Sequence, residues 1–201
     1  MTRRFGARRS TTLVKRTLVP VLVLGSLLWA SSWALAAGRS GQAAVSRDPA
    51  GGLLSANDGG APMFVVPDAR PGHPVRRCIR ISFAGPSPAA VRLYGVTTGD
   101  RMSRLVRLTV VRGTMPDATS FPSCQGFEAN ASDFSGLGPG VLYRGLVAGY
   151  PDTRGHGIRD PHDGWTSGES HVYEFVLRVE SDDDAQGRRL LQDFLWTAKG
   201  A

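Results

Sequence analysis

The residues best suited to catalysis gather in one loop, between residues 148 and 168. The loop contains two histidines and three aspartates, and four of these residues could meet at one site: His156, Asp160, His162 and Asp163. Imidazole and carboxylate groups bind zinc, and a hydrolytic zinc site needs three fixed ligands, an open position and usually a nearby glutamate as base. The sequence has no HExxH motif, and its other histidines, His73 and His171, lie outside the loop. We therefore interpret the loop as a solvated polar segment, with a zinc hydrolase as the alternative.

Serine nucleophiles and a calcium loop are the other chemical candidates. Ser120, Ser167 and Ser170 lie outside any GxSxG elbow, and the sequence places no histidine or aspartate beside them as a base. The run Asp182–Asp184 offers carboxylates without the alternating ligand spacing of a calcium loop, so we interpret it as a charged turn. The sequence therefore predicts no catalytic residue, no metal ligand and no cofactor.

Two sets of side chains are candidates for binding a partner. The first consists of arginines expected on the solvent face of strands: Arg76, Arg80, Arg92 and Arg107. If their strands are neighbours, these arginines form a basic strip suited to anionic wall polymers; the alternative, which we favour, is an ordinary soluble sheet face. The second set consists of strand aromatics: Tyr173, Phe175, Phe194 and Trp196. We assign them to the core rather than to a ligand groove, because they alternate with polar residues.

Alternation of apolar and polar residues predicts the strands that position these side chains. Along residues 75–83, Ile79, Ile81 and Phe83 share one face while Arg76 and Arg80 share the other, as in a strand buried on one side. Related patterns predict further strands, at 63–66, 91–94, 105–112, 141–147, 170–180 and around 194–196. No segment keeps a helical period. We therefore predict an all-β fold, an antiparallel two-sheet sandwich of about seven to eight strands.

Positive charge is concentrated at the N-terminus. The net charge is +7, but six of the 24 basic residues precede residue 17, so residues 38–201 carry 18 basic and 17 acidic side chains. This balance argues against nucleic-acid binding. The basic start is followed by an apolar stretch at 18–35 and by small residues at 34–37. The pattern predicts a secretory signal over residues 1–37, cut after Ala36 by a signal peptidase.

An uncleaved membrane anchor is the alternative, because about 20 apolar residues span a bilayer, and a twin-arginine signal is a further one. In each case the positively charged start stays on the cytoplasmic side of the membrane, and residues 38–201 lie on the other side. The chain then contacts the membrane only through its N-terminal segment. Residues 38–61 are rich in Gly, Ala, Ser and Asp, which predicts a flexible linker before a domain at 62–199.

The sequence contains two cysteines, Cys78 and Cys124. In an exported domain, two cysteines indicate one disulfide, with two free thiols as the alternative. Cys78 falls on the polar face of its strand and Cys124 in a loop. A bond between them would hold that loop over the surface of the sheet.

Four segments carry a resemblance to a known family. They are PGHPVRRCIRISFAG (71–85), AAVRLYG (89–95), GESHVYEFVLRVE (168–180) and DDAQGRRLLQDFLWTAK (183–199). In order and spacing they resemble the TasA and camelysin family of Gram-positive bacteria, closest to actinobacterial members whose signal peptides are cut by a dedicated signal peptidase. The resemblance implies a jelly-roll sandwich and secretion to the cell surface. In some relatives it also implies matrix fibres, in which the mature N-terminus adds a strand to a neighbouring subunit.

Here residues 38–61 are poor in β-branched and aromatic residues, so they predict a weak donor strand. We therefore expect an exported, non-catalytic surface or matrix protein. Its expected partners are copies of itself or wall polymers. The alternatives are a secreted metallopeptidase, the activity attached to camelysin, and a wall-binding adhesin.

Overall fold

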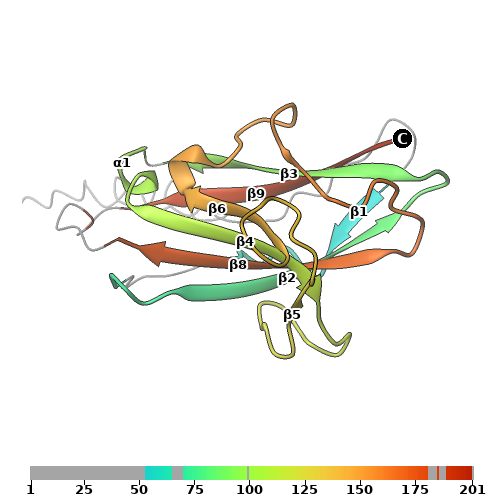
Figure 1. Ribbon diagram of the computed structural model, residues 1–201, viewed down its shortest axis with the longest axis horizontal. Coiled ribbons are helices and arrows are strands. Elements are labelled where there is room, and N and C mark those ends of the chain that lie inside the picture. Colours follow the sequence, from blue (N-terminus) through green and yellow to red (C-terminus); the bar gives the residue numbers. More distant parts are fainter. Residues whose placement is uncertain (1–52, 65–69, 99, 181–184, 186–188, 201) are drawn as a thin grey trace, which may run out of the picture. The chain divides into compact units, whose positions relative to one another are not determined.

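Strands are the main regular structure of the described residues and lie in two antiparallel sheets (Figure 1). The structure is a computed structural model that describes residues 53–64, 70–98, 100–180, 185 and 189–200, all within the compact unit Ala37–Ala201. The predicted leader and the first part of the predicted linker lie outside these residues. No helix in the described ranges is long and apolar enough to cross a membrane.

The larger sheet has six strands in the order β1-β2-β8-β4-β5, with β6 also paired to β4. Their bounds are β1 (Leu53–Ala56), β2 (Val75–Ala84), β4 (Val106–Thr114), β5 (Glu128–Ala129), β6 (Val141–Leu146) and β8 (Ser170–Val179). The smaller sheet has the order β7-β3-β9, with β3 (Ala89–Thr98), β7 (Ile158–Arg159) and β9 (Leu191–Gly200). Two short helical turns are α1 (Asp100–Ser103) and η1 (Val147–Gly149).

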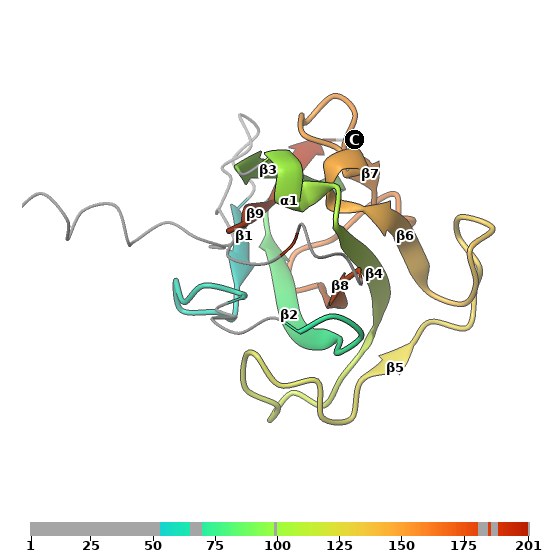
Figure 2. The same ribbon diagram turned by 90° about the vertical axis from the view of Figure 1, so that its left-hand side faces the viewer.

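The core fills the space between the two sheets. Figure 2 shows β3 and β9 on one side of it and β2, β4 and β8 on the other. Aromatic side chains meet at its centre, where the rings of Phe175 and Phe194 lie 4.4 Å apart and Trp196 lies 5.9 Å from both Phe175 and Tyr173. All four are at most 1 % exposed. Their assignment to the core is therefore confirmed.

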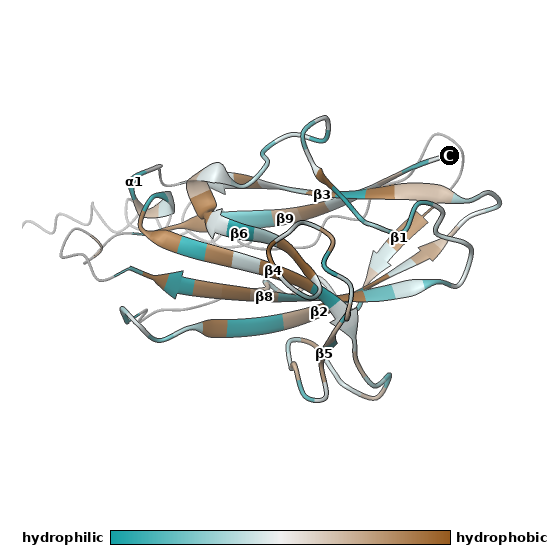
Figure 3. Ribbon diagram, viewed as in Figure 1, coloured by the Kyte–Doolittle hydropathy of each residue, from teal (hydrophilic) through white to brown (hydrophobic). Residues whose placement is uncertain are grey.

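Period-two patterns account for the long strands. Ile79, Ile81 and Phe83 of β2 are buried while Arg76 is exposed, and Figure 3 shows hydrophilic and hydrophobic bands alternating along β2, β4 and β8. The prediction of an antiparallel, two-sheet all-β fold is confirmed.

The first strand begins earlier than the sequence suggested. β1 lies inside the segment predicted as a linker, and it pairs with the end of β2, with Leu54 opposite Phe83. Leu54 is 1 % exposed, so β1 contributes a buried side chain to the core and covers an edge of β2 that would otherwise be open. Conversely, Met63 and Phe64 of the strand predicted at 63–66 are not in a strand, although Met63 is buried.

A disulfide joins Cys78 to Cys124 across 46 residues, with the two Cα atoms 5.0 Å apart. Cys78 is fully buried on the outer side of β2, in a small apolar cluster with Met115 and Val172, against which Phe127 packs. As predicted, the bond holds a loop over the outer surface of the larger sheet.

Candidate functional site

An aspartate buried in the interior, Asp160, is the centre of a polar network. Its Oδ2 accepts hydrogen bonds from Nε of Arg112 at 3.0 Å and from the hydroxyl of Tyr173 at 2.7 Å. Its Oδ1 accepts from Nε1 of Trp165 at 3.1 Å and from the backbone N–H of His162 at 3.0 Å. The carboxylate is 0 % exposed, and these four donors offset the cost of removing its charge from water.

Both sheets contribute to this network. Arg112 lies on the inner face of β4, with Val110, and is directly opposite Tyr173 of β8. Asp160 follows β7, and its backbone N–H donates to the carbonyl of Val91 in β3 at 2.9 Å. The Arg112–Asp160 ion pair therefore links the larger sheet to the smaller one through the core.

The network continues to the surface through three side chains, His162, Glu169 and His171, which we call the histidine rim. Nη2 of Arg112 lies 2.8 Å from Nδ1 of His171. Oε1 of Glu169 lies 2.6 Å from Nε2 of His171 and 3.2 Å from Nε2 of His162. The His171 side chain is 17 % exposed and that of His162 is 51 % exposed, so the rim opens outward at His162.

The surroundings of Glu169 and His171 shift the pKa values of both side chains. Burial, followed by the positive charge of Arg112, lowers the pKa of His171, against the opposing effect of its hydrogen bond to Glu169. Burial acts to raise the pKa of Glu169, but the Thr166 backbone N–H, the His171 hydrogen bond and the charge of His162 together lower it. At neutral pH, Glu169 is therefore ionised and His171 is neutral.

The network stabilises charged side chains, but neither Tyr173 nor the three serines considered from the sequence is arranged as a nucleophile. Burial, and then the charge of Asp160, raise the pKa of the Tyr173 phenol well above its usual value, so Tyr173 stays protonated and donates. Ser120 and Ser167 are exposed and Ser170 is half-buried. Among the described residues, no hydrogen bond links one of these hydroxyls to a histidine, so none of these three serines has an activating base.

The residues considered for zinc are not arranged as a metal site. Asp160 is surrounded by donors, Asp163 pairs with Arg159 at 3.1 Å, and His156 is exposed. In the part of the chain that the structure describes, one group of three potential ligands lies close enough to share a metal, namely Cys78, Cys124 and Glu174. Its two sulfurs are bonded to each other. The acidic run Asp182–Asp184 lies outside the described residues.

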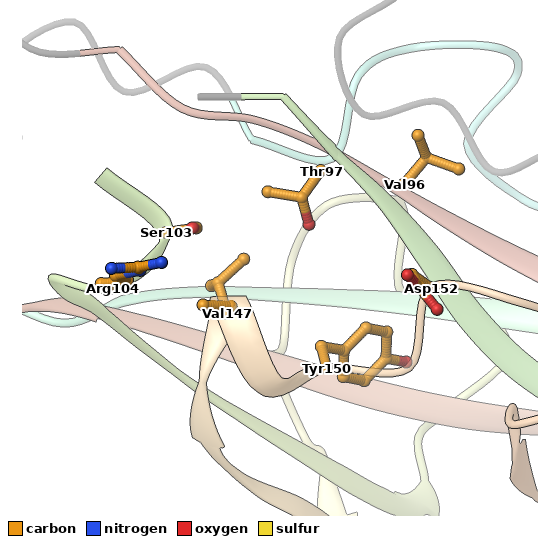
Figure 4. A pocket seen from close by; sticks show the side chains of 8 residues that line it. Val96, Thr97, Ser103, Arg104, Val147, Tyr150 and Asp152 are labelled. Carbon is orange, nitrogen blue, oxygen red and sulfur yellow. The ribbon is translucent and has the colours of Figure 1, made fainter. Parts of the chain in front are cut away.

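A shallow hollow of about 430 Å³ lies between η1, α1 and the end of β3 (Figure 4). Arg104 and Asp152, which line it, are exposed, and Tyr150 forms part of its wall. The hydroxyl of Thr97 donates to Oε1 of Gln192 at 2.5 Å. Burial raises the pKa of Tyr150, which therefore does not act as a base. The hollow is the weaker candidate, because the described residues that line it include no histidine, no cysteine and no ion pair.

The four arginines considered as a basic strip do not form one. Arg92 lies on β3 of the smaller sheet and donates to a backbone carbonyl at 2.8 Å. Arg80 has a side chain only 17 % exposed and donates to Asp117 Oδ1 at 2.6 Å. Arg76 and Arg107 do share the outer face of the larger sheet, but β8 lies between their strands.

No protein-family model matches this chain, and no curated protein does. The site is therefore interpreted from its own geometry.

Sequence reasoning missed the members of the network outside the His156–Asp163 loop. One signal was available: Arg112 has the same parity as Val106, Leu108 and Val110, so the alternation places a guanidinium on the inner face of β4. A charged residue at such a position requires a buried partner. Nothing local identifies that partner, because Asp160 is 48 residues away and lies in a loop.

Proposed function

We propose that this protein is an exported, non-catalytic structural protein of the cell surface or extracellular matrix. The buried Cys78–Cys124 disulfide carries the proposal. Disulfides persist in oxidising compartments and are rare in a reducing cytosol, and Cys78 is fully enclosed once its loop is in place. The fold thus uses a cross-link that suits a protein working outside the cytoplasm.

The leader supports the same proposal. Its basic start, apolar stretch and small residues fit a signal that a signal peptidase cuts after Ala36, or an anchor retained in the membrane. The two-sheet fold is compatible with the jelly-roll sandwich implied by the resemblance to the TasA and camelysin family. Its proposed partners are copies of itself or cell-wall polymers, not nucleic acid.

The absence of catalysis is proposed from the buried network. All four donors around Asp160 come from the protein itself, and the histidine rim is bonded internally through Glu169. Such a network fixes the position of the loop after β7 on the sheets. It leaves no carboxylate oxygen of Asp160 for a substrate or a metal.

Expression of the full chain with its own leader tests the proposal. We expect the protein outside the cytoplasmic membrane, with Cys78 and Cys124 linked when peptides are mapped without reduction. N-terminal sequencing distinguishes a released protein, starting at Ala37, from an anchored one. A cytoplasmic protein with both cysteines alkylated before reduction would overturn export. Stoichiometric zinc with casein cleavage that is lost in His156→Ala and His162→Ala would overturn the non-catalytic assignment.

A further inference from the structure

Strands β2, β8, β4 and β6 are neighbours in the larger sheet (Figure 1). By strand register, each of them carries an arginine on the outer face of that sheet. These arginines are, in that order, Arg76, Arg178, Arg107 and Arg144. We call these four residues the arginine face. Two of them belong to the strip considered from the sequence, and the other two replace Arg80 and Arg92.

The strand register places these side chains close together. Arg107 is directly opposite Arg178 in the β4–β8 ladder. The next row across the sheet reads Arg76, Val176, Thr109 and Arg144. Neighbouring strands lie about 4.8 Å apart, so this row is roughly 14 Å long. The face is therefore a compact patch of guanidinium groups.

The patch carries more positive than negative charge. Arg76 binds Glu174, and Arg107 binds Glu180. The other two arginines are exposed and form no ion pair within the described residues. Counting only residues that the structure describes, these four cations and two anions leave an excess of two positive charges.

Folding alone does not account for this choice of residues. Like charges directly opposite each other in a ladder destabilise a sheet, yet Arg107 faces Arg178. The side chains of Arg76 and Arg107 are more than half exposed even when paired, at 57 % and 56 %. Arg107 uses only its Nε on Glu180, so its two terminal amino groups remain able to donate.

We propose that the arginine face binds a polymer that carries repeated phosphate groups. The paired N–H groups of an arginine guanidinium match the spacing of phosphate oxygens. Two opposed guanidinium groups can share one tetrahedral phosphate, whereas a planar carboxylate matches the paired N–H groups of a single arginine. The side chains between the arginines, Val176 and Thr109, are not aromatic, so the face offers no platform for stacked bases. A phosphate polymer without bases is the better fit. This proposal goes beyond the function proposed above and does not depend on where the protein resides.

Binding of the full chain to long-chain inorganic polyphosphate, measured at several salt concentrations, tests the proposal. The informative variant is Arg144→Gln with Arg178→Gln, because neither arginine holds a described ion pair. Its matched control is Arg189→Gln with Lys199→Gln, which removes the same charge from exposed residues on or next to β9. Each arginine–phosphate contact adds about one to the slope of log affinity against log salt, so we expect the first variant to lose roughly two from that slope.

We expect the control variant to bind like the parent, and polyphosphate to bind more tightly than polyglutamate of matched length or a single-stranded oligonucleotide. We also expect Arg178→Gln to keep or raise the melting temperature, because it removes a like-charge pair. Equal binding by parent and Arg144→Gln/Arg178→Gln would overturn the site. An equal loss of slope in the control variant would show that polyphosphate is attracted by net charge rather than by the arginine face, and would also overturn the site. Equal binding of polyglutamate or of the oligonucleotide would overturn the ligand class.

Discussion

At the residue scale, we expect the buried ion pair of Asp160 and Arg112 to be highly sensitive to substitution. Asp160→Asn keeps the size of the side chain but leaves the Arg112 guanidinium, 7 % exposed, without its counterion. Removing one partner of a buried pair costs about 3–5 kcal/mol. We expect that loss in the free energy of unfolding, measured by urea denaturation.

Asp163→Asn is the matched control. Asp163 also pairs with an arginine, Arg159, but its side chain is 72 % exposed. Surface pairs contribute about 0–1 kcal/mol, so this variant should unfold close to the parent. If the two variants lost the same stability, the buried pair would be no more important than the exposed one.

The lowered pKa of His171 predicts how the free energy of unfolding depends on pH. Burial and Arg112 lower its pKa in the folded state below the unfolded value of 6.5, so the unfolded chain takes up a proton first as the pH falls. Stability is therefore complete above about pH 6.5 and decreases as the pH falls toward the lower folded pKa. The lowered pKa of Glu169 adds a further loss below its unfolded value of 4.5.

The measurement is the free energy of unfolding between about pH 5 and 8, the interval in which histidine titrates. His171→Asn should flatten the decrease, whereas His156→Asn, which alters an exposed histidine, should leave it unchanged. A parent protein that became more stable on acidification through this interval would contradict the assigned state of His171.

At the element scale, substitutions in β1 test whether this short strand is a stable part of the domain. Leu54 is 1 % exposed and Leu53 is 38 % exposed, so the two neighbours form a matched pair. Leu54→Ala should cost about 2–5 kcal/mol and Leu53→Ala about 0.5 kcal/mol or less. Amide exchange should also speed up at Ser82, on the edge of β2 that faces β1, in the first variant alone, whereas the amide of Phe83, which donates to Glu169, should be unaffected. Equal effects of the two substitutions would mean that β1 does not anchor the sheet.

The disulfide acts on a loop rather than on a strand pair. In the chain-entropy model, closing a loop with a sequence separation of 46 contributes up to about 4 kcal/mol. Cys78→Ser with Cys124→Ser should therefore lower the denaturation midpoint, and limited proteolysis should cut near residues 115–127 before it cuts the strands. A variant with unchanged midpoint and unchanged cleavage would show that the apolar cluster alone holds the loop.

The sequence predicts the long strands well because burial on one face imposes a period of two on them. It predicts β5 and β7 poorly, because two residues cannot show a period. The candidate site is harder to predict for a different reason. Arg112 has a recognisable position on β4, but Asp160 reaches it only when β7 packs beside β3. That contact depends on the fold and not on the local sequence.

At the scale of the whole molecule, charge is divided between two regions with different roles. Six basic residues precede the apolar stretch, while residues 38–201 are nearly neutral. Within the described residues, the buried network brings opposite charges together in the interior, and the arginine face keeps like charges together on the surface. The net charge of residues 38–201 therefore reveals neither the buried ion pair nor the arginine face.

The pairing of β2 with β8 governs when the domain can fold. Arg76 of β2 bonds with Glu174, which follows 98 residues later in the chain. At about 5–20 residues per second, β8 leaves the ribosome roughly 5–20 s after β2. Until then β2 lacks a central neighbour, and the entropy of closing so long a loop opposes the sheet. The nascent chain should therefore remain extended while it is synthesised. An unfolded chain is the form that the proposed export through a narrow channel requires; under that proposal, assembly of the sheets and oxidation of the cysteines both follow translocation.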